Sequence, residues 1–221
     1  MSSACGSADD YESNESIGAI AQAHTWVKPT NVSFASVPSW PYQTIVDFFN
    51  FARDVRWLKM NGNPYFKRRV SWLYPDGGCE ARAEIIAYRA GISLLPKPYK
   101  IFVVNDLMLY TNNHPNGSVN WGHHVAPVVR SSSSGRPYVL DPSVDPRSPL
   151  RWTTWFQLLN SKSITLVAVE DPSNYSPFEG VTGDINTALG EMKYNFLQRE
   201  WDRQVELGRD PNQVLDDSPP W

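Results

Sequence analysis

The sequence predicts an α+β fold in which helices come first, mostly antiparallel strands follow, and a long helix ends the domain. Three observations predict it. Apolar residues recur at three- and four-residue intervals from Tyr42 to Trp57, which indicates an amphipathic helix. The middle of the chain holds short runs of aromatic and β-branched residues separated by turn-forming sequences. A second helical periodicity begins at Asp184 and continues to Val205.

The segment before the first helix is expected to be a flexible tail and linker. It is rich in Ser, Ala, Asp, Asn and Pro. Pro38 and Pro41 prevent the chain around them from forming a helix, because proline lacks the N–H donor and restricts the residue before it. We therefore expect a tail over residues 1–40, a single domain over residues 41–210 and a C-terminal tail over residues 211–221.

A turn and a helix follow the first helix. Pro75, Asp76, Gly77 and Gly78 favour a turn, and the eleven residues after Cys79 are strong helix formers up to Gly91. Cys79 is thus predicted to lie at a helix start.

The later elements are read from local composition. A Ser-rich turn over residues 131–135 predicts an antiparallel hairpin between the strands that flank it. The predicted strands and helices are strands at Tyr99–Val104, His123–Val129 and Pro137–Leu140, a short helix around Trp152–Leu159, a strand at Ile164–Val169 and a helix from Asp184.

Charge, hydropathy and cysteine spacing exclude several classes of protein. The chain carries 20 Lys and Arg against 23 Asp and Glu, without a basic run that could bind phosphates, so nucleic acid is not an expected partner. No apolar run approaches the roughly 20 residues needed to cross a bilayer, so no transmembrane segment is expected. The two cysteines, Cys5 and Cys79, lie in no zinc-ligand pattern, and Cys79 is expected to be a free thiol.

The first residues suggest a location. Small residues precede Cys5 and a polar stretch follows it, as at the junction where bacterial lipoproteins are cut and acylated. This pattern predicts a secreted or cell-envelope protein of a bacterium, or one delivered to a target cell, with Cys5 as a candidate lipidation site. The alternative is a flexible tail with an incidental cysteine.

Cys79 is the candidate nucleophile. A thiol is reactive when ionised, and the N-terminus of a helix favours ionisation through its unpaired N–H groups and its dipole. Gly77 and Gly78 allow a substrate to approach the backbone closely, and the Cys79 amide could stabilise an oxyanion. The alternative is a small buried packing residue.

A cysteine nucleophile needs a base, and the chain has four histidines. His24 lies in the expected tail and His114 in a polar turn, where a solvated side chain is the default. His123 and His124 begin a predicted strand, so their side chains point to opposite faces. The alternation of residues does not choose between them.

A carboxylate should orient the base. Asp141 follows the apolar strand Tyr138–Leu140 and precedes Pro142, so it lies beside the strand that carries the histidines. Asp145 also precedes a proline but follows no comparable strand. Either aspartate could instead initiate a turn.

Three short blocks resemble the bacterial protein-glutaminases, in the transglutaminase-like branch of the papain-like cysteine enzymes. Gly78 to Ala83 resembles the nucleophile block, Trp121 to Ala126 the histidine block, and Val139 to Ser143 the acid block. The resemblance implies a papain/transglutaminase-like fold, with the nucleophile at a helix N-terminus packed on an antiparallel sheet that carries His and Asp. It also assigns Cys79 as nucleophile, His124 as base and Asp141 as its orienter.

The resemblance further implies hydrolytic deamidation of protein- or peptide-bound glutamine by a domain that needs no metal or organic cofactor. Gly78, Trp121, His123 and Ser143, which lie in the same blocks, are expected to form the oxyanion and substrate-binding surroundings. A transglutaminase or a cysteine peptidase could use the same triad. A non-catalytic binding protein on this scaffold, with its aromatic residues as the contact surface, is the alternative from another class.

Overall fold

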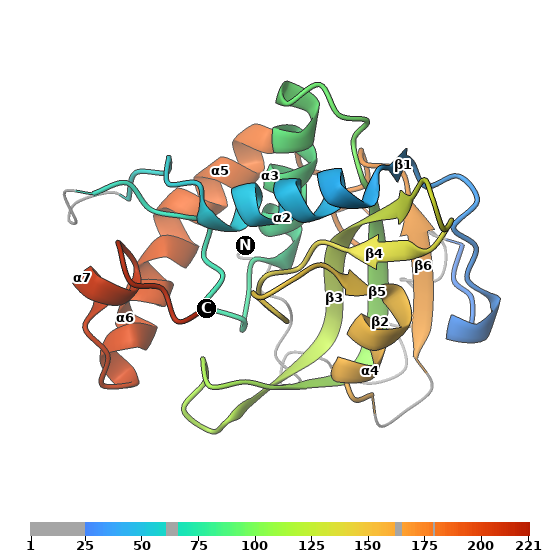
Figure 1. The fold of residues 1–221 in the computed structure, drawn as a ribbon. Helices are drawn as coiled ribbons and strands as arrows, with labels where there is room; N and C mark the ends of the chain where they lie inside the picture. The colour runs from blue at the N-terminus through green and yellow to red at the C-terminus, as the bar shows by residue number, and fades with distance from the viewer. Residues whose placement is uncertain (1–24, 61–65, 162–164, 179) are drawn as a thin grey trace.

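The computed structural model describes residues 25–60, 66–161, 165–178 and 180–221. One antiparallel sheet lies on one side of the molecule, helices α5 to α7 lie on the other, and α3 lies between them (Figure 1). Helix α2 crosses in front of α3 in this view. The predicted α+β fold with an antiparallel sheet is confirmed.

The sheet has six strands, and its centre is the long antiparallel pair β2 and β3. The order is β5-β4-β3-β2-β6, with β1 parallel to the end of β3. The register places Val128 opposite Val139, which confirms the predicted hairpin. The strands are β1 (Ser39–Trp40), β2 (Tyr99–Tyr110), β3 (Ser118–Ser131), β4 (Pro137–Val139), β5 (Leu150–Arg151) and β6 (Leu166–Glu170).

Four helices begin at or next to the predicted residues, at Tyr42, Cys79, Trp152 and Ile185, whereas η2 and α7 were not predicted. Asp184 caps α5 by accepting hydrogen bonds from the Asn186 and Thr187 N–H groups. A π-helical turn, η3, continues α5 directly into α6. The helices are η2 (Pro29–Asn31, a 3₁₀ turn), α2 (Tyr42–Asp54), α3 (Cys79–Ile92), α4 (Trp152–Leu158), α5 (Ile185–Glu191), η3 (Met192–Phe196), α6 (Leu197–Glu206) and α7 (Pro211–Val214).

The buried apolar residues form two clusters. Helix α3 contributes to both, because Cys79 and Ala83 belong to one cluster and Ile85 and Ile86 to the other. Both faces of β3 are therefore buried over most of its length. This burial fixes the start of α3 against the centre of β3, where His123 and His124 lie.

Packed structure begins before residue 41, where the domain was expected to start. Val27 exchanges two backbone hydrogen bonds of 2.9 Å with Val167, and Val37 and Trp40 are each only 1% exposed. Val37 belongs to one apolar cluster of the core and Trp40 to the other, whereas the composition of this segment had suggested a linker. The first part of the expected tail, including Cys5, and Ile164 in the last predicted strand lie outside the described residues.

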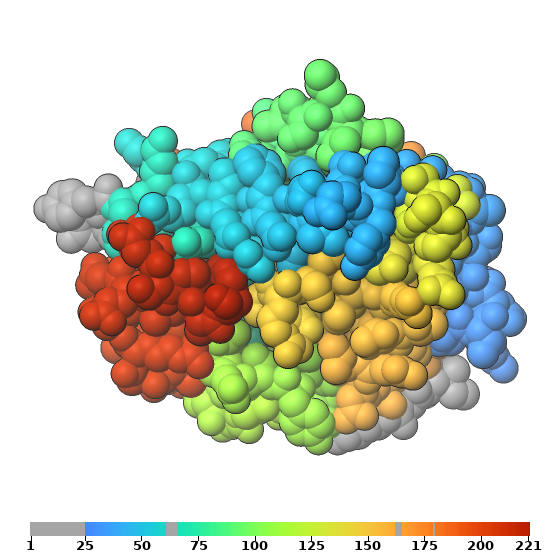
Figure 2. Space-filling view, viewed as in Figure 1, coloured from blue at the N-terminus to red at the C-terminus, as the bar shows by residue number. Residues whose placement is uncertain are grey.

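The last residues also pack on the domain. Leu215 is 4% exposed, and the Trp221 indole N–H donates to Asp54 Oδ1 at 3.0 Å. Figure 2 shows this C-terminal segment, in red, forming one continuous surface with α2. Among the described residues, no helix is both long and apolar enough to span a membrane.

Candidate active site

Cys79 is the first residue of α3, as predicted. The residue before it, Gly78, caps the helix in the left-handed region with φ of +79°. A β-carbon on Gly78 would lie 2.8 Å from the Phe196 ring, closer than van der Waals contact permits. Backbone conformation and packing therefore both require glycine here.

The loop that leads into α3, residues 71–78, is held by an arginine of the helix itself. We call it the leading loop. The Arg82 Nη1 donates to the carbonyl oxygens of Ser71, Tyr74 and Gly77 at 3.4, 3.1 and 2.6 Å. Arg82 is 2% exposed, so these bonds are shielded from water. The helix start and the loop before it thus form one rigid unit.

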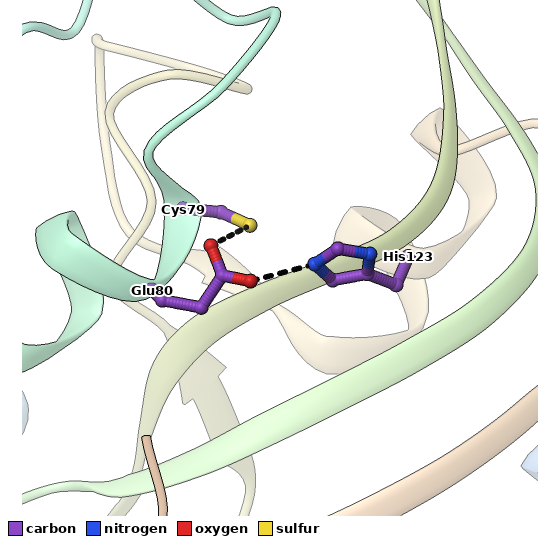
Figure 3. Close-up of side chains that lie close together, drawn as sticks. All are labelled: Cys79, Glu80 and His123. Carbon is purple, nitrogen blue, oxygen red and sulfur yellow. Dashed lines mark hydrogen bonds and ion pairs between the residues drawn. The ribbon is translucent and has the colours of Figure 1, made fainter. Parts of the chain in front are cut away.

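His123 forms a buried ion pair with the residue that follows Cys79. Its Nε2 lies 2.7 Å from Glu80 Oε1, and Glu80 Oε2 lies 3.2 Å from the Cys79 sulfur (Figure 3). Burial by itself would raise the pKa of Glu80, but the His123 charge and hydrogen bond outweigh it and lower that pKa. Glu80 is therefore anionic and its negative charge is balanced chiefly by His123.

The same three residues are a candidate metal-binding group among the described residues. One ligand atom from each of Cys79, Glu80 and His123 lies within 4.8 Å of the others, and all three residues are buried. In this structure Glu80 Oε1 and His123 Nε2 are already joined by a hydrogen bond.

Replacing His123 with alanine should destabilise the fold by about 3–5 kcal/mol, because it leaves the Glu80 charge buried without a partner. Urea unfolding would measure the change. The double variant Glu80→Gln, His123→Ala should recover part of the loss. His114→Ala, at a half-buried histidine 3.4 Å from Asp76, is the control and should change stability by less than about 1 kcal/mol. Equal unfolding midpoints for His123→Ala and His114→Ala would contradict this account.

His124 has a different partner on the other face of β3. Its Nε2 lies 2.8 Å from Asp141 Oδ2, and its ring stacks on the Trp121 indole with centroids 4.4 Å apart. The Trp155 ring also stacks with His124, with centroids 5.7 Å apart. Within the described part of the chain, His124 Nδ1 has no hydrogen-bond partner. If Nε2 carries the proton that Asp141 accepts, Nδ1 carries a lone pair that can accept another.

Asp141 is strongly held in its ionised form. Its Oδ1 accepts from the Ser143 hydroxyl at 2.5 Å and the Ser143 N–H at 3.2 Å, and its Oδ2 accepts from the Trp155 indole N–H at 2.9 Å. Burial alone would raise its pKa, but His124, Ser143 and Arg82 together lower that pKa to about 2. Asp141 is therefore ionised at any pH well above that pKa.

The other predicted site residues are brought to the same region. Gly78 caps the helix of Cys79, His123 pairs with Glu80, and Ser143 orients Asp141. Trp121 is fully buried, stacks on His124 and donates to the Pro75 carbonyl oxygen at 3.0 Å, so it supports the histidine and the leading loop.

Three contributors were missed by the sequence reasoning: Glu80, Arg82 and Trp155. Glu80 and Arg82 stand in the nucleophile block itself, and their position beside Cys79 was the available signal. Trp155 lies in a helix predicted from its apolar spacing, and nothing local marks its indole N–H as a partner of Asp141.

Cys79 is not a free thiol in this structure. It is disulfide-bonded, so the expectation of a free thiol is wrong for this state, and its side chain is fully buried. The chain's other cysteine, Cys5, lies outside the described residues. A reactive thiolate therefore requires reduction, and a substrate requires a more open state than this one.

Comparison with known proteins identifies the family. A family model described as Glutaminase matches residues 45–159, which include Cys79, both adjacent histidines and Asp141. The solution structure of protein-glutaminase from Chryseobacterium proteolyticum is similar, with 22% identity and a TM-score of 0.53, over 70% of this chain and 87% of that one. A crystal structure of protein-glutaminase has 19% identity and a TM-score of 0.51, over 84% and 94%. No curated protein sequence matches this chain. The match over residues 45–159 shows that the chain belongs to the glutaminase family.

Proposed function

We propose that this enzyme hydrolyses the side-chain amide of glutamine in proteins or peptides, with Cys79 as nucleophile, His124 as base and Asp141 as its orienter. The observation that carries the proposal is the His124–Asp141 pair at 2.8 Å. The His124 ring stacks with two indoles that belong to the same apolar cluster as Cys79. The similar solved structures are those of protein-glutaminase, which supports a glutamine side chain as the substrate.

The reaction begins from reduced Cys79. His124 Nδ1 takes the thiol proton, and the sulfur attacks the carboxamide carbon of glutamine. The tetrahedral oxyanion is stabilised by N–H groups at the start of α3, where the first-turn amides have no intrahelical acceptor. The imidazolium then donates its proton to the nitrogen of the tetrahedral intermediate, the C–N bond breaks, and ammonia leaves while a γ-glutamyl thioester remains on Cys79.

Hydrolysis completes the cycle. His124 takes a proton from water, the hydroxide adds to the thioester carbon, and the sulfur leaves as the thiol after reprotonation. Glutamate and ammonia are the products. Asp141 stabilises the imidazolium in both halves of the reaction and keeps the Nε2 proton in place, so that Nδ1 is the basic atom.

The charge environment favours His124 over His123 as the base. The Glu80 carboxylate, which contacts the sulfur, already binds His123 Nε2 (Figure 3). That arrangement places a carboxylate between the thiol and the imidazole, so His123 is a poor proton acceptor for Cys79. It serves instead to neutralise Glu80 beside the nucleophile.

The proposal is tested with reduced protein and a peptide containing one glutamine. Ammonia release together with a mass increase of about one dalton per glutamine would support it, since an amide becomes an acid. Adding a primary amine separates the related reaction, because a transglutaminase would transfer the acyl group to the amine. Backbone cleavage would indicate a peptidase. Intact, folded protein that yields none of these products would overturn the proposal.

Enzyme prepared without a reducing agent should be inactive and should resist iodoacetamide, because a disulfide sulfur is not a thiolate. Treatment with a dithiol should expose Cys79 to alkylation and restore ammonia release in parallel. Peptide mapping by mass spectrometry would locate the label. Full activity and full labelling of Cys79 before reduction would contradict the oxidised state of the structure.

A further inference from the structure

The helical segment Met192–Glu206 lies against the leading loop, residues 71–78, and binds its backbone. Glu200 Oε1 accepts from the Leu73 N–H at 2.8 Å, and Gln204 Nε2 donates to the Leu73 carbonyl oxygen at 3.4 Å. Glu200 and Gln204 are 3% and 0% exposed. Both backbone polar groups of Leu73 are therefore bound by one helix.

A second contact holds the loop closer to Cys79. Arg203 binds Asp76 in a bidentate pair, with Nη1 to Oδ2 at 2.8 Å and Nη2 to Oδ1 at 3.0 Å. Its guanidinium also lies over the Tyr74 ring, 5.2 Å from the centroid. The side chains are 11% and 22% exposed, so water screens the pair only partly. Such a planar bidentate pair fixes the relative orientation of the two side chains as well as the distance between them.

The third contact reaches the residue before Cys79. The Phe196 ring fills the space beside Gly78 where a β-carbon would stand. Phe196 ends the π-helical turn, and Glu200 and Arg203 follow it at helical spacings of four and three residues, so all three lie on the face that contacts the loop. The helix therefore contacts the loop at Leu73, Asp76 and Gly78.

We propose that the segment Met192–Glu206 positions Cys79 by holding the leading loop against α3, with Arg203 as a positioning residue. Arg82 of α3 binds the loop carbonyl oxygens, and Glu200 and Gln204 of α6 bind the backbone of Leu73 in the same loop. The segment follows the region that the family model matches, which ends at residue 159. The kinetic part of this inference rests on the proposed function; the part on thiol reactivity does not.

Positioning matters because the sulfur must meet both the substrate carbon and the base. A displacement of about 1 Å in an attacking group can lower the rate about 100-fold. Loss of the Arg203–Asp76 pair removes the contact that fixes the loop two residues before Gly78. It leaves Cys79, His124 and Asp141 chemically intact.

The test compares Arg203→Gln and Asp76→Asn with Arg199→Gln, an exposed arginine on the same helix. In reduced protein, the two loop variants should lower kcat about 10- to 100-fold with little change in KM, while Arg199→Gln matches wild type. The double variant should lose little more than either single variant, because both substitutions break the same Arg203–Asp76 pair. Rates are normalised to the fraction of Cys79 that iodoacetamide can alkylate.

The pH profile of Cys79 alkylation separates positioning from simple stabilisation. It should differ from wild type in Arg203→Gln and Asp76→Asn and remain unchanged in Arg199→Gln. A fall in thermal stability with normal kcat per alkylatable thiol and an unchanged profile would overturn the inference. If Arg203→Gln does not fold, Asp76→Asn, which keeps the shape of the side chain, decides the question by the same measurements. If the wild type lacks deamidase activity but the two loop variants still alter the alkylation profile, only the proposed function is refuted.

Discussion

Replacing Cys79 with alanine should abolish ammonia release from a glutamine peptide, with a loss on the order of 10⁴-fold or more in kcat. The reason is chemical. Alanine removes the atom that attacks the carboxamide in the proposed mechanism, and among the described residues no other side chain at the start of α3 carries a nucleophile of comparable strength. The side chain is fully buried in a position that tolerates a small apolar group, so the fold should survive the change.

The matched control is Cys5→Ala, measured under reducing conditions. It removes the only other sulfhydryl of the chain and should leave kcat near that of the wild type. Circular dichroism and thermal unfolding would verify that Cys79→Ala is folded. Activity of folded Cys79→Ala within about tenfold of the wild type would eliminate covalent catalysis at this residue.

Much of this geometry could be predicted from the sequence because it is local. The short hairpin places Asp141 beside β3, and the Leu140 N–H donates to the Pro127 carbonyl oxygen at 2.8 Å, as expected for a strand end next to the histidines. The Gly-Gly pair and the helix formers after Cys79 likewise placed the cysteine at a helix start. Turn length and helix propensity act within a few residues, so the sequence carries them directly.

The remaining features depend on packing between distant segments. Alternation along β3 predicted opposite directions for His123 and His124, but it could not show that helices and loops cover both faces and bury both rings to 1% exposure. Glu80 stands in the first turn of a helix, where a carboxylate is usually solvated and stabilised by the helix dipole. Only the approach of β3 gives it a buried histidine as a partner.

The C-terminal helices show the same limit. Their periodicity predicted a helix from Asp184, yet the contacts of Glu200 and Arg203 with the leading loop join residues about 127 positions apart. No local pattern distinguishes these charged residues from exposed ones such as Arg199. Their contacts form only when α6 packs against the leading loop in the folded chain.

Replacing Asp141 with asparagine should lower kcat by about 10³- to 10⁴-fold while Asp145→Asn leaves it nearly unchanged. Both aspartates precede a proline in the same segment, so the pair is a matched comparison. Asp141 binds His124, whereas the carboxylate of Asp145 binds Arg147. Only the first substitution removes the charge that, in the proposed mechanism, stabilises the imidazolium and fixes the Nε2 proton. Equal losses in the two variants would show that the effect is structural.

Asp141→Asn should also change how the free energy of unfolding varies at low pH, and the pKa of Asp141 determines the direction of that change. That pKa is 3.8 in an unperturbed chain and about 2 in the fold. The folded state therefore binds the proton less readily, and the carboxylate contributes on the order of 2 kcal/mol at pH values above about 4. This contribution should disappear as the pH falls from about 4 to about 2, so the wild type should lose its advantage over Asp141→Asn across that interval. Urea unfolding at several pH values would measure the difference. A gap between the two proteins that persists unchanged at pH 2 would mean that the hydrogen bonds of Ser143 and Trp155, and not the charge of Asp141, provide the stabilisation.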